Sequence, residues 1–193
     1  MKHLFVTLAL VVAPLTPGFA AIQFTKAKGS SQFLAIGNPS AIRIEGKGDG
    51  PEGDLQIRDD GKNVVIGGAL KVDMKSYNTG ISLRDRHMKE KYLEVEKFQV
   101  ATLTLKDISL VKEQLQKNPE TKAGFDGTLE LHGVQKPVHG EFTLKPAASG
   151  GGYTVAAKFP LKLSDYAITV PSFAGITVAD QVEINTTTDV EKF

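Results

Sequence analysis

Hydrophobic and polar side chains alternate along most of the chain, which is the pattern of β-strands with one buried and one solvated face. The clearest run places its apolar side chains at Tyr153, Val155, Ala157, Phe159, Leu161 and Leu163. Other runs of this period begin at Ile22, Ile42, Val64, Leu103, Leu129, Val138 and Val182. About eight strands joined by short turns predict an all-β fold, an antiparallel sandwich or barrel. Alternation alone does not distinguish these two.

Two features indicate that the sheet curves and closes. Gly67 and Gly68 interrupt the run that begins at Val64, and glycines inside a strand predict a bulge, which is one way in which sheets curve. The run at Val182 is close to the C-terminus, where it could pair with an early strand and close the sheet. Residues 111–116 are compatible with either a helical turn or an irregular excursion.

One stretch departs from the alternation and predicts a helix. Ser82 is followed three residues later by Asp85, which resembles the start of a capping box. Apolar side chains then recur at helical spacing, at Met88, Tyr92 and Val95. We expect a helix from about residue 82 to 98, lying over one open end of the sheet.

The first 20 residues predict a secretory signal peptide. Lys2 supplies a short positive segment, residues 4–13 are apolar, and Gly18-Phe19-Ala20 forms a small-x-small cleavage site. Pro14 and Pro17 end the apolar run well before the roughly 20 residues that span a membrane. We therefore expect one domain over residues 21–193, without a transmembrane segment, in the bacterial periplasm or, as the alternative, in the medium.

Composition removes several classes of function. The 193 residues contain no cysteine, which excludes an acylated lipoprotein start, disulfides and thiolate chemistry. Loss of Lys2 with the signal peptide reduces the 23 basic residues to 22, against 22 acidic ones. A chain of near-zero net charge gives no support to a nucleic-acid partner or to broad attraction by anionic membranes.

The candidate catalytic and metal motifs are weak. His132 and His139 flank a segment in which a two-residue turn at Gln135 and Lys136 would place them opposite each other, but a zinc or copper site needs further ligands. The Gly- and Asp-rich residues 46–54 lack the spacing of an EF-hand and predict a hairpin turn. The sequence contains no G-x-S-x-G elbow, HExxH, P-loop or dinucleotide fingerprint. We expect neither catalytic residues nor a metal.

Three ordered motifs carry a resemblance to a known family. They are Thr79-Gly80 with Arg84-Asp85-x-His87-Met88 and Lys91 to Val95, then Leu131 to Val138, and finally Leu163 to Tyr166 with Gly175 to Ile184. Together they resemble the YceI-like family of bacterial lipid-binding proteins. The resemblance implies a lipocalin-like barrel with an elongated apolar tunnel that takes a long isoprenoid or a similar amphiphile without covalent attachment, and no other cofactor.

This tunnel needs an apolar lining and a few polar groups where the ligand head emerges. For the lining we predict Leu70, Val72, Met88, Tyr92, Leu103, Leu105, Leu129, Leu131, Phe142, Val155, Phe159, Leu161, Phe173 and Ile176. Arg84, Asp85 and His87 have two interpretations. In the first, Arg84 or His87 meets a polar or phosphorylated head group near the mouth. In the second, the three residues fix the helix, with Asp85 as its cap and the other two bonded to loop carbonyls.

The sequence therefore predicts a binding protein, not an enzyme, that carries or sequesters a polyisoprenoid, an isoprenoid quinone or a fatty-acid derivative. Two alternatives remain open at this point. One is a barrel with a filled interior whose surface serves an envelope partner, and the other is a hydrolase with an unrecognised site. The oligomeric state also stays open, with a homodimer among the possibilities.

Overall fold

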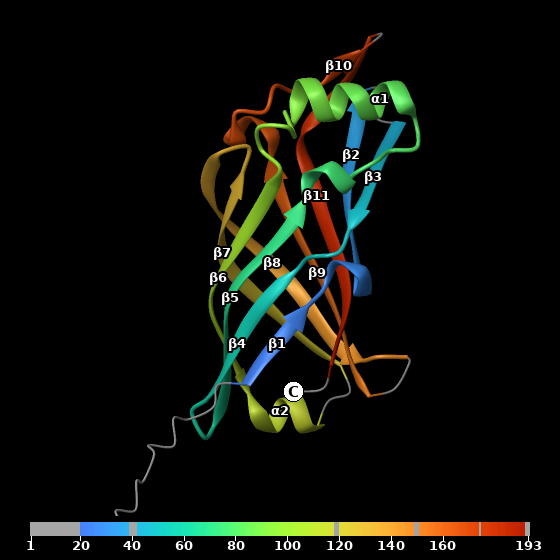
Figure 1. The fold of residues 1–193 in the computed structure, drawn as a ribbon. Helices are drawn as coiled ribbons and strands as arrows, with labels where there is room; N and C mark the ends of the chain where they lie inside the picture. Colours follow the sequence, from blue (N-terminus) through green and yellow to red (C-terminus); the bar gives the residue numbers. More distant parts are fainter. Residues whose placement is uncertain (1–19, 39–41, 118–119, 149–150, 174, 192–193) are drawn as a thin grey trace, which may run out of the picture.

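The computed structural model describes residues 20–38, 42–117, 120–148, 151–173 and 175–191, without the side chains of Ala20, Gln116 and Phe173. Long antiparallel strands curl into an elongated barrel (Figure 1). The strands are β1 (Ala20–Phe24), β2 (Gly29–Asn38), β3 (Ile42–Asp49), β4 (Gly53–Asp59), β5 (Asn63–Asp73), β6 (Val100–Val111), β7 (Thr121–Leu131), β8 (Val134–Pro146), β9 (Gly152–Lys162), β10 (Ser172–Phe173) and β11 (Ile176–Glu191). No helix in the described ranges is both long and apolar enough to cross a membrane.

All eleven strands belong to one sheet, in the order β1-β4-β5-β6-β7-β8-β9-β11-β2-β3, with β10 paired to β11. The predicted all-β barrel is confirmed, although the sheet has more strands than the eight or so expected. Strand β2 was not predicted. Phe33 lies on one face and Leu34 and Ile36 lie on the other, so the segment lacks the alternation of apolar and polar residues. As predicted, the C-terminal strand pairs with an early strand, since β11 lies between β2 and β9. The two edges of the sheet are β1 and β3.

The glycine-rich residues 46–54 do not form the predicted hairpin turn. Strand β3 pairs with β2, whereas β4 pairs with β1 and β5. The chain thus passes from β3, at one edge of the sheet, to β4, which lies next to the edge strand β1 on the other side. Gly46 is required within β3, because a Cβ there would lie 2.0 Å from the ring of Phe33.

The bulge predicted at Gly67 and Gly68 is confirmed. The β5–β6 register shifts between Ile66 and Gly68, and Gly68 has a φ of +145°. A Cβ at Gly68 would lie 2.8 Å from the carbonyl oxygen of Asp54. Glycine at this position therefore allows both the backbone conformation and the close approach of β4.

The β6–β7 ladder is incomplete. Residues 102–105 of β6 pair with residues 127–130 of β7, and the ladder does not continue to residues 106–111 and 121–126. The connection carries the helix α2 (Lys112–Lys117), which lies at one end of the barrel (Figure 1). Leu115 of α2 packs against the core, so the helix is held against this end of the barrel. Residues 111–116 are thus largely helical.

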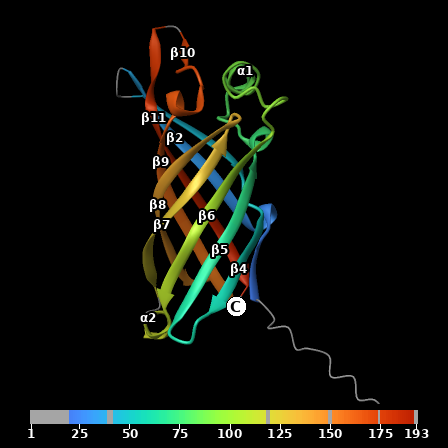
Figure 2. The same ribbon diagram turned by 90° about the vertical axis from the view of Figure 1, so that its left-hand side faces the viewer.

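A short helix covers the opposite end of the barrel, as Figure 2 also shows. It consists of α1 (Ser82–His87) and a π-helical turn, η3 (Met88–Tyr92), and we refer to residues 82–92 as the lid. The lid is shorter than the predicted 82–98. It ends because Glu94 adopts a φ of +43° and its carbonyl oxygen accepts bonds from the N–H groups of Lys97 and Phe98, which turns the chain back to β6.

The capping box predicted at Ser82 and Asp85 is wrong. Ile81 occupies the N-cap position of α1, and no side chain caps the helix. Three short 3₁₀ turns complete the secondary structure, η1 (Lys26–Lys28), η2 (Met74–Ser76) and η4 (Leu163–Tyr166).

Candidate ligand-binding cavity

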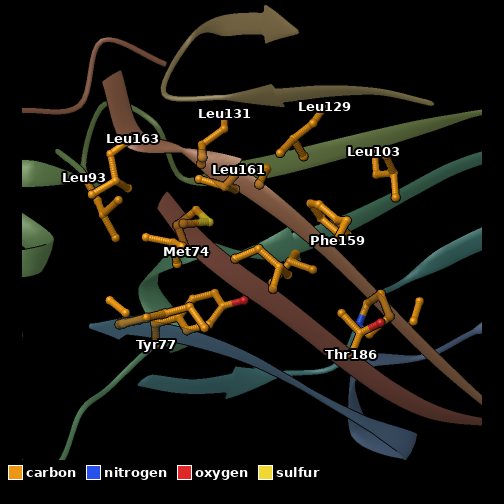
Figure 3. Close-up of a pocket in the computed structure, with 18 of the residues that line it drawn as sticks. Met74, Tyr77, Leu93, Leu103, Leu129, Leu131, Phe159, Leu161, Leu163 and Thr186 are labelled. Carbon is orange, nitrogen blue, oxygen red and sulfur yellow. The ribbon is translucent and has the colours of Figure 1, made fainter. Parts of the chain in front are cut away.

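A cavity of about 510 Å³ lies inside the barrel. Its wall includes members of two buried apolar clusters, one near the lid, with Leu131 and Ile168, and one near α2, with Ile22 and Leu55. Side chains such as Phe142 pack against both clusters. The cavity therefore extends along the barrel. Its lining combines inward positions of the alternating strands, such as Leu103 and Phe159, with residues outside the strands, such as Tyr77 and Leu93 (Figure 3).

The structure brings the predicted lining residues together around this one cavity. Phe173 is the exception, because its side chain is outside the described part of the chain. The residues that line the cavity are Leu70, Val72, Met88, Tyr92, Leu103, Leu105, Leu129, Leu131, Phe142, Val155, Phe159, Leu161 and Ile176. Their contact with a ligand stays a prediction.

Sequence reasoning missed a second set of lining residues. Four of these residues come from strands whose inward face depends on the pairing partner: Phe33, Ile44, Leu55 and Ile66. Tyr77 comes from the segment before the lid. For Ile44 and Ile66 the alternating pattern was itself the signal. No local signal indicated Tyr77, whose ring lies 5.7 Å from that of Phe33.

Burial affects the chemistry of Tyr77. It raises the pKa of this phenol above its ordinary value, and a hydrogen bond with the Ser31 hydroxyl partly offsets the effect. The hydroxyl of Tyr77 therefore stays neutral throughout the physiological range, as suits a group in an apolar wall.

Two charged side chains of the lid are bonded to Thr79, in the loop that precedes it. Asp85 Oδ1 accepts bonds from the N–H of Thr79 at 2.6 Å and from its hydroxyl at 2.5 Å. Arg84 donates to the Thr79 hydroxyl through Nε at 2.7 Å and to the Thr79 carbonyl oxygen at 3.0 Å. This arrangement agrees with the interpretation that these side chains fix the lid, except that Asp85 holds the preceding loop instead of capping the helix. Arg84 and His87 also line the cavity, so head-group contact stays a prediction for them.

The two histidines of the β7–β8 hairpin do not face each other. The turn lies at His132 and Gly133, with φ of +53° and +74°, instead of the predicted position three residues later. His132 contacts the Tyr166 carbonyl oxygen at 3.1 Å and Glu94 Oε2 at 2.9 Å. His139 is bonded to Asp126. His132 therefore ties the hairpin to η4 and to the end of the lid.

Within the described residues, no three His, Cys, Asp or Glu side chains are grouped to hold a metal.

With this geometry established, the chain can be compared with known proteins. The sequence model of the YceI-like domain matches residues 23–190, which include every predicted lining residue and the lid. The chain belongs to the YceI-like family. The resemblance carried by the three sequence motifs is therefore confirmed. No curated protein matches the chain in sequence.

Two solved structures are similar to this YceI-like chain. A polyisoprenoid-binding domain from Saccharophagus degradans, implicated in plant cell wall breakdown, has a TM-score of 0.60 at 16% identity and covers 91% of this chain and 100% of its own. BcnA from Burkholderia cenocepacia has a TM-score of 0.64 at 17% identity and covers 88% of this chain and 99% of its own. At these identities the likeness establishes the fold.

Proposed function

We propose that this YceI-like protein holds a long apolar ligand inside its barrel for transport, storage or sequestration. The observation that carries the proposal is the cavity of about 510 Å³, whose wall is apolar along nearly its whole length. Its volume lies within the roughly 300–1,000 Å³ that is usual for small-molecule sites. A barrel that served only as a surface module would have this interior filled with side chains.

The ligand class that we propose is a polyisoprenoid, an isoprenoid quinone or a fatty-acid derivative. Each buried CH₂ group contributes roughly 0.8 kcal/mol, so an apolar tail binds tightly without any charged contact. The similar domain from Saccharophagus degradans is a polyisoprenoid-binding domain, and this supports the proposed class.

We further propose that the protein works outside the cytoplasm, in the periplasm or the medium. The support is the signal-like pattern of residues 1–20, which lie outside the described part of the chain apart from Ala20. N-terminal sequencing of the protein purified from its native envelope should give Ala21 as the first residue.

The proposal is tested by identifying the cargo. The protein is purified from its native envelope and extracted with organic solvent, and the extract is analysed by mass spectrometry. We expect a long-chain species at a molar ratio close to one. An empty extract, together with failure of the stripped protein to bind a prenyl chain in titration, would contradict the carrier function and favour the filled-barrel interaction module.

A substitution in the cavity separates binding from folding. Phe159 lines the cavity and packs edge-to-face on Phe125 at a centroid distance of 6.0 Å. Phe159→Arg should abolish uptake of an apolar fluorescent probe while the β-sheet circular dichroism spectrum is kept, because a desolvated guanidinium cannot share the cavity with a tail. The control, Phe159→Leu, should still bind the probe. Loss of folding in Phe159→Arg would assign Phe159 to the structural core.

A further inference from the structure

Two threonines interrupt the apolar wall of the cavity far from the lid. Polar lining residues occur at the lid end, where Thr79, Arg84 and His87 lie, and then only at Thr186 and Thr188 among the described residues, apart from tyrosine hydroxyls and Ser172 of β10. Thr186 and Thr188 occupy successive inward positions of β11. Figure 3 shows Thr186 on the side of the cavity away from Leu93 and Leu163.

The register places this pair near the α2 end of the cavity. Thr186 lies opposite Ala157 of β9, and Thr188 lies opposite Val155, which packs against the cluster near α2. At about 3.4 Å per residue, Thr186 is roughly 25 Å along β11 from Val178 at the lid end. The two hydroxyls are therefore deep inside the barrel.

Thr188 carries a polar group that the protein itself does not satisfy. The residue is 1% exposed, and its Oγ1 has no hydrogen-bond partner in the described structure. A buried hydroxyl without a partner is destabilising, and valine would give the same shape and an equally good strand. Strand formation therefore does not explain the hydroxyl.

The neighbouring strand accommodates the hydroxyl of Thr188 because it has a glycine there. Gly29 lies opposite Thr188 on β2, and a Cβ at this glycine would come within 2.3 Å of Thr188 Oγ1. The hydroxyl of Ser31, one inward position along β2, donates to the Asp49 carbonyl oxygen at 2.6 Å. Ser31 is thus already bonded elsewhere. A change of the χ1 rotamer of Thr188 moves its hydroxyl to another staggered position, and this turns the hydroxyl toward a different part of its surroundings.

We propose that Thr186 and Thr188 form a subsite for a neutral hydrogen-bonding oxygen of the ligand, so that the polar end lies deep in the barrel and the tail extends toward the lid. This inference rests on the proposed function and specifies the ligand class. The oxygen belongs to an alcohol, ketone, ester or amide, because a threonine hydroxyl can donate to a carbonyl or accept from an O–H. The charged groups in the lining, Arg84 and His87, lie at the lid end, so a carboxylate or phosphate at Thr186 would be buried without a counter-charge.

The lid end of the cavity is better suited to the apolar tail of the ligand than to its polar head group. Arg84 and Asp85 are bonded to Thr79, whereas Ile81 and Leu83 line the cavity mouth and are 54% and 46% exposed. An emerging tail would cover part of this apolar surface, which is otherwise in contact with water.

Matched ligands test the subsite. Stripped protein is titrated with hexadecanol and with hexadecane, in competition with an apolar fluorescent probe. We expect the wild type to bind the alcohol about tenfold more tightly than the alkane. The double variant Thr186→Val/Thr188→Val should bind both with similar affinity, while the control Thr186→Ser/Thr188→Ser should keep the preference for the alcohol. An unchanged preference in the valine variant would overturn the proposal.

The two proposals fail in different ways. If neither ligand binds, the proposed function fails together with the subsite. If both bind equally well to the wild type, the carrier function stands and the subsite is refuted. Orientation is read separately from an alcohol that carries a photoreactive diazirine at its last carbon. Crosslinks to the lid, at Ile81 or Leu83, are expected, and crosslinks to Leu55 or Ile66 near α2 would overturn the inward orientation.

Discussion

At the scale of single residues, the Thr79 hydroxyl, in the loop before the lid, bonds to two side chains of opposite charge. The Thr79 hydroxyl donates to Asp85 and accepts from Arg84, and the Thr79 backbone bonds to both side chains as well. Two side chains of opposite charge on α1 are thereby held to one residue of the preceding loop. Arg84 and Asp85 of the family motif thus attach the lid to this loop.

Replacing Arg84 tests this role. Arg84→Ala should lower the free energy of unfolding by about 1–3 kcal/mol, because hydrogen bonds from a charged donor to Thr79 are lost. It should weaken phosphorylated and neutral ligands of equal tail length to the same extent. Urea denaturation and parallel titrations measure the two effects. Arg86→Ala removes the same charge from an exposed position of α1 and serves as the control. A selective loss of the phosphorylated ligand would instead assign Arg84 to head-group binding.

Ionisation of the buried Tyr166 should lower the stability of the protein at alkaline pH. The residue is 1% exposed, and burial, with a smaller contribution from the charge of Asp165, raises the pKa of its phenol to about 12. Below pH 10 the folded and unfolded chains both keep this proton, so the stabilisation is complete. As the pH rises from 10 to 12 the unfolded chain loses the proton first, and the free energy of unfolding should fall by about 2 kcal/mol.

Tyr166→Phe should flatten this decline, as measured by urea unfolding at intervals from pH 9 to 12. Tyr77 has a pKa that is raised in the same direction, so part of the slope should persist in the single variant. An identical slope in the wild type and Tyr166→Phe would show that Tyr166 titrates normally.

At the scale of elements, the bulge in β5 determines how β4 and β6 can approach. Gly68→Ala should destabilise the protein by about 1–3 kcal/mol, because alanine is strained at a φ of +145° and its Cβ would meet the Asp54 carbonyl oxygen. Gly124 of β7 is the matched control, since the nearest atom to a Cβ there is 3.7 Å away. Gly124→Ala should be neutral or slightly stabilising. Chemical denaturation of the two variants distinguishes them, and equal losses would contradict this account of the bulge.

The elements that could be predicted are those whose pattern is local. The alternation around Phe159 predicted β9, and the spacing of Met88 and Tyr92 predicted a helix over the barrel end. The path from β3 to β4 could not be predicted from the sequence. A glycine-rich segment is compatible both with a turn and with a strand that packs against the ring of Phe33. The end of the lid depends on the positive φ of Glu94, which its residue type does not indicate.

At the scale of the whole molecule, the proposed ligand should make the loaded barrel more stable than the empty one. A ligand present at 100 times its Kd stabilises the folded state by about 2.7 kcal/mol, which corresponds to a rise in Tm of roughly 5–10 °C for a domain of this size. Calorimetry of stripped and reloaded protein should show this difference. In Phe159→Arg, ligand addition should leave Tm unchanged, and a similar rise there would contradict the assigned position of the ligand.

The candidate site was predictable to the extent that it is made of inward strand positions. Alternation identified Leu103, Leu129 and Leu161 without any knowledge of their partners. The Thr186–Thr188 subsite was not found, because threonine is an ordinary strand residue. Its unsatisfied hydroxyl becomes apparent only when β11 is placed against Gly29 and Ser31 of β2.

The incomplete β6–β7 ladder has a further consequence for the surface of the barrel. Besides the outer strands β1 and β3, it leaves two strand edges open within the wall, and such edges are templates for association with another chain. The segments that carry them bear exposed charges, Lys106 and Asp107 on β6 and Lys122 and Asp126 on β7. Charged side chains, lysine above all, are a common defence of natural sheets against edge-to-edge pairing. Where β6 and β7 separate, these four charged residues should therefore oppose aggregation through the open edges.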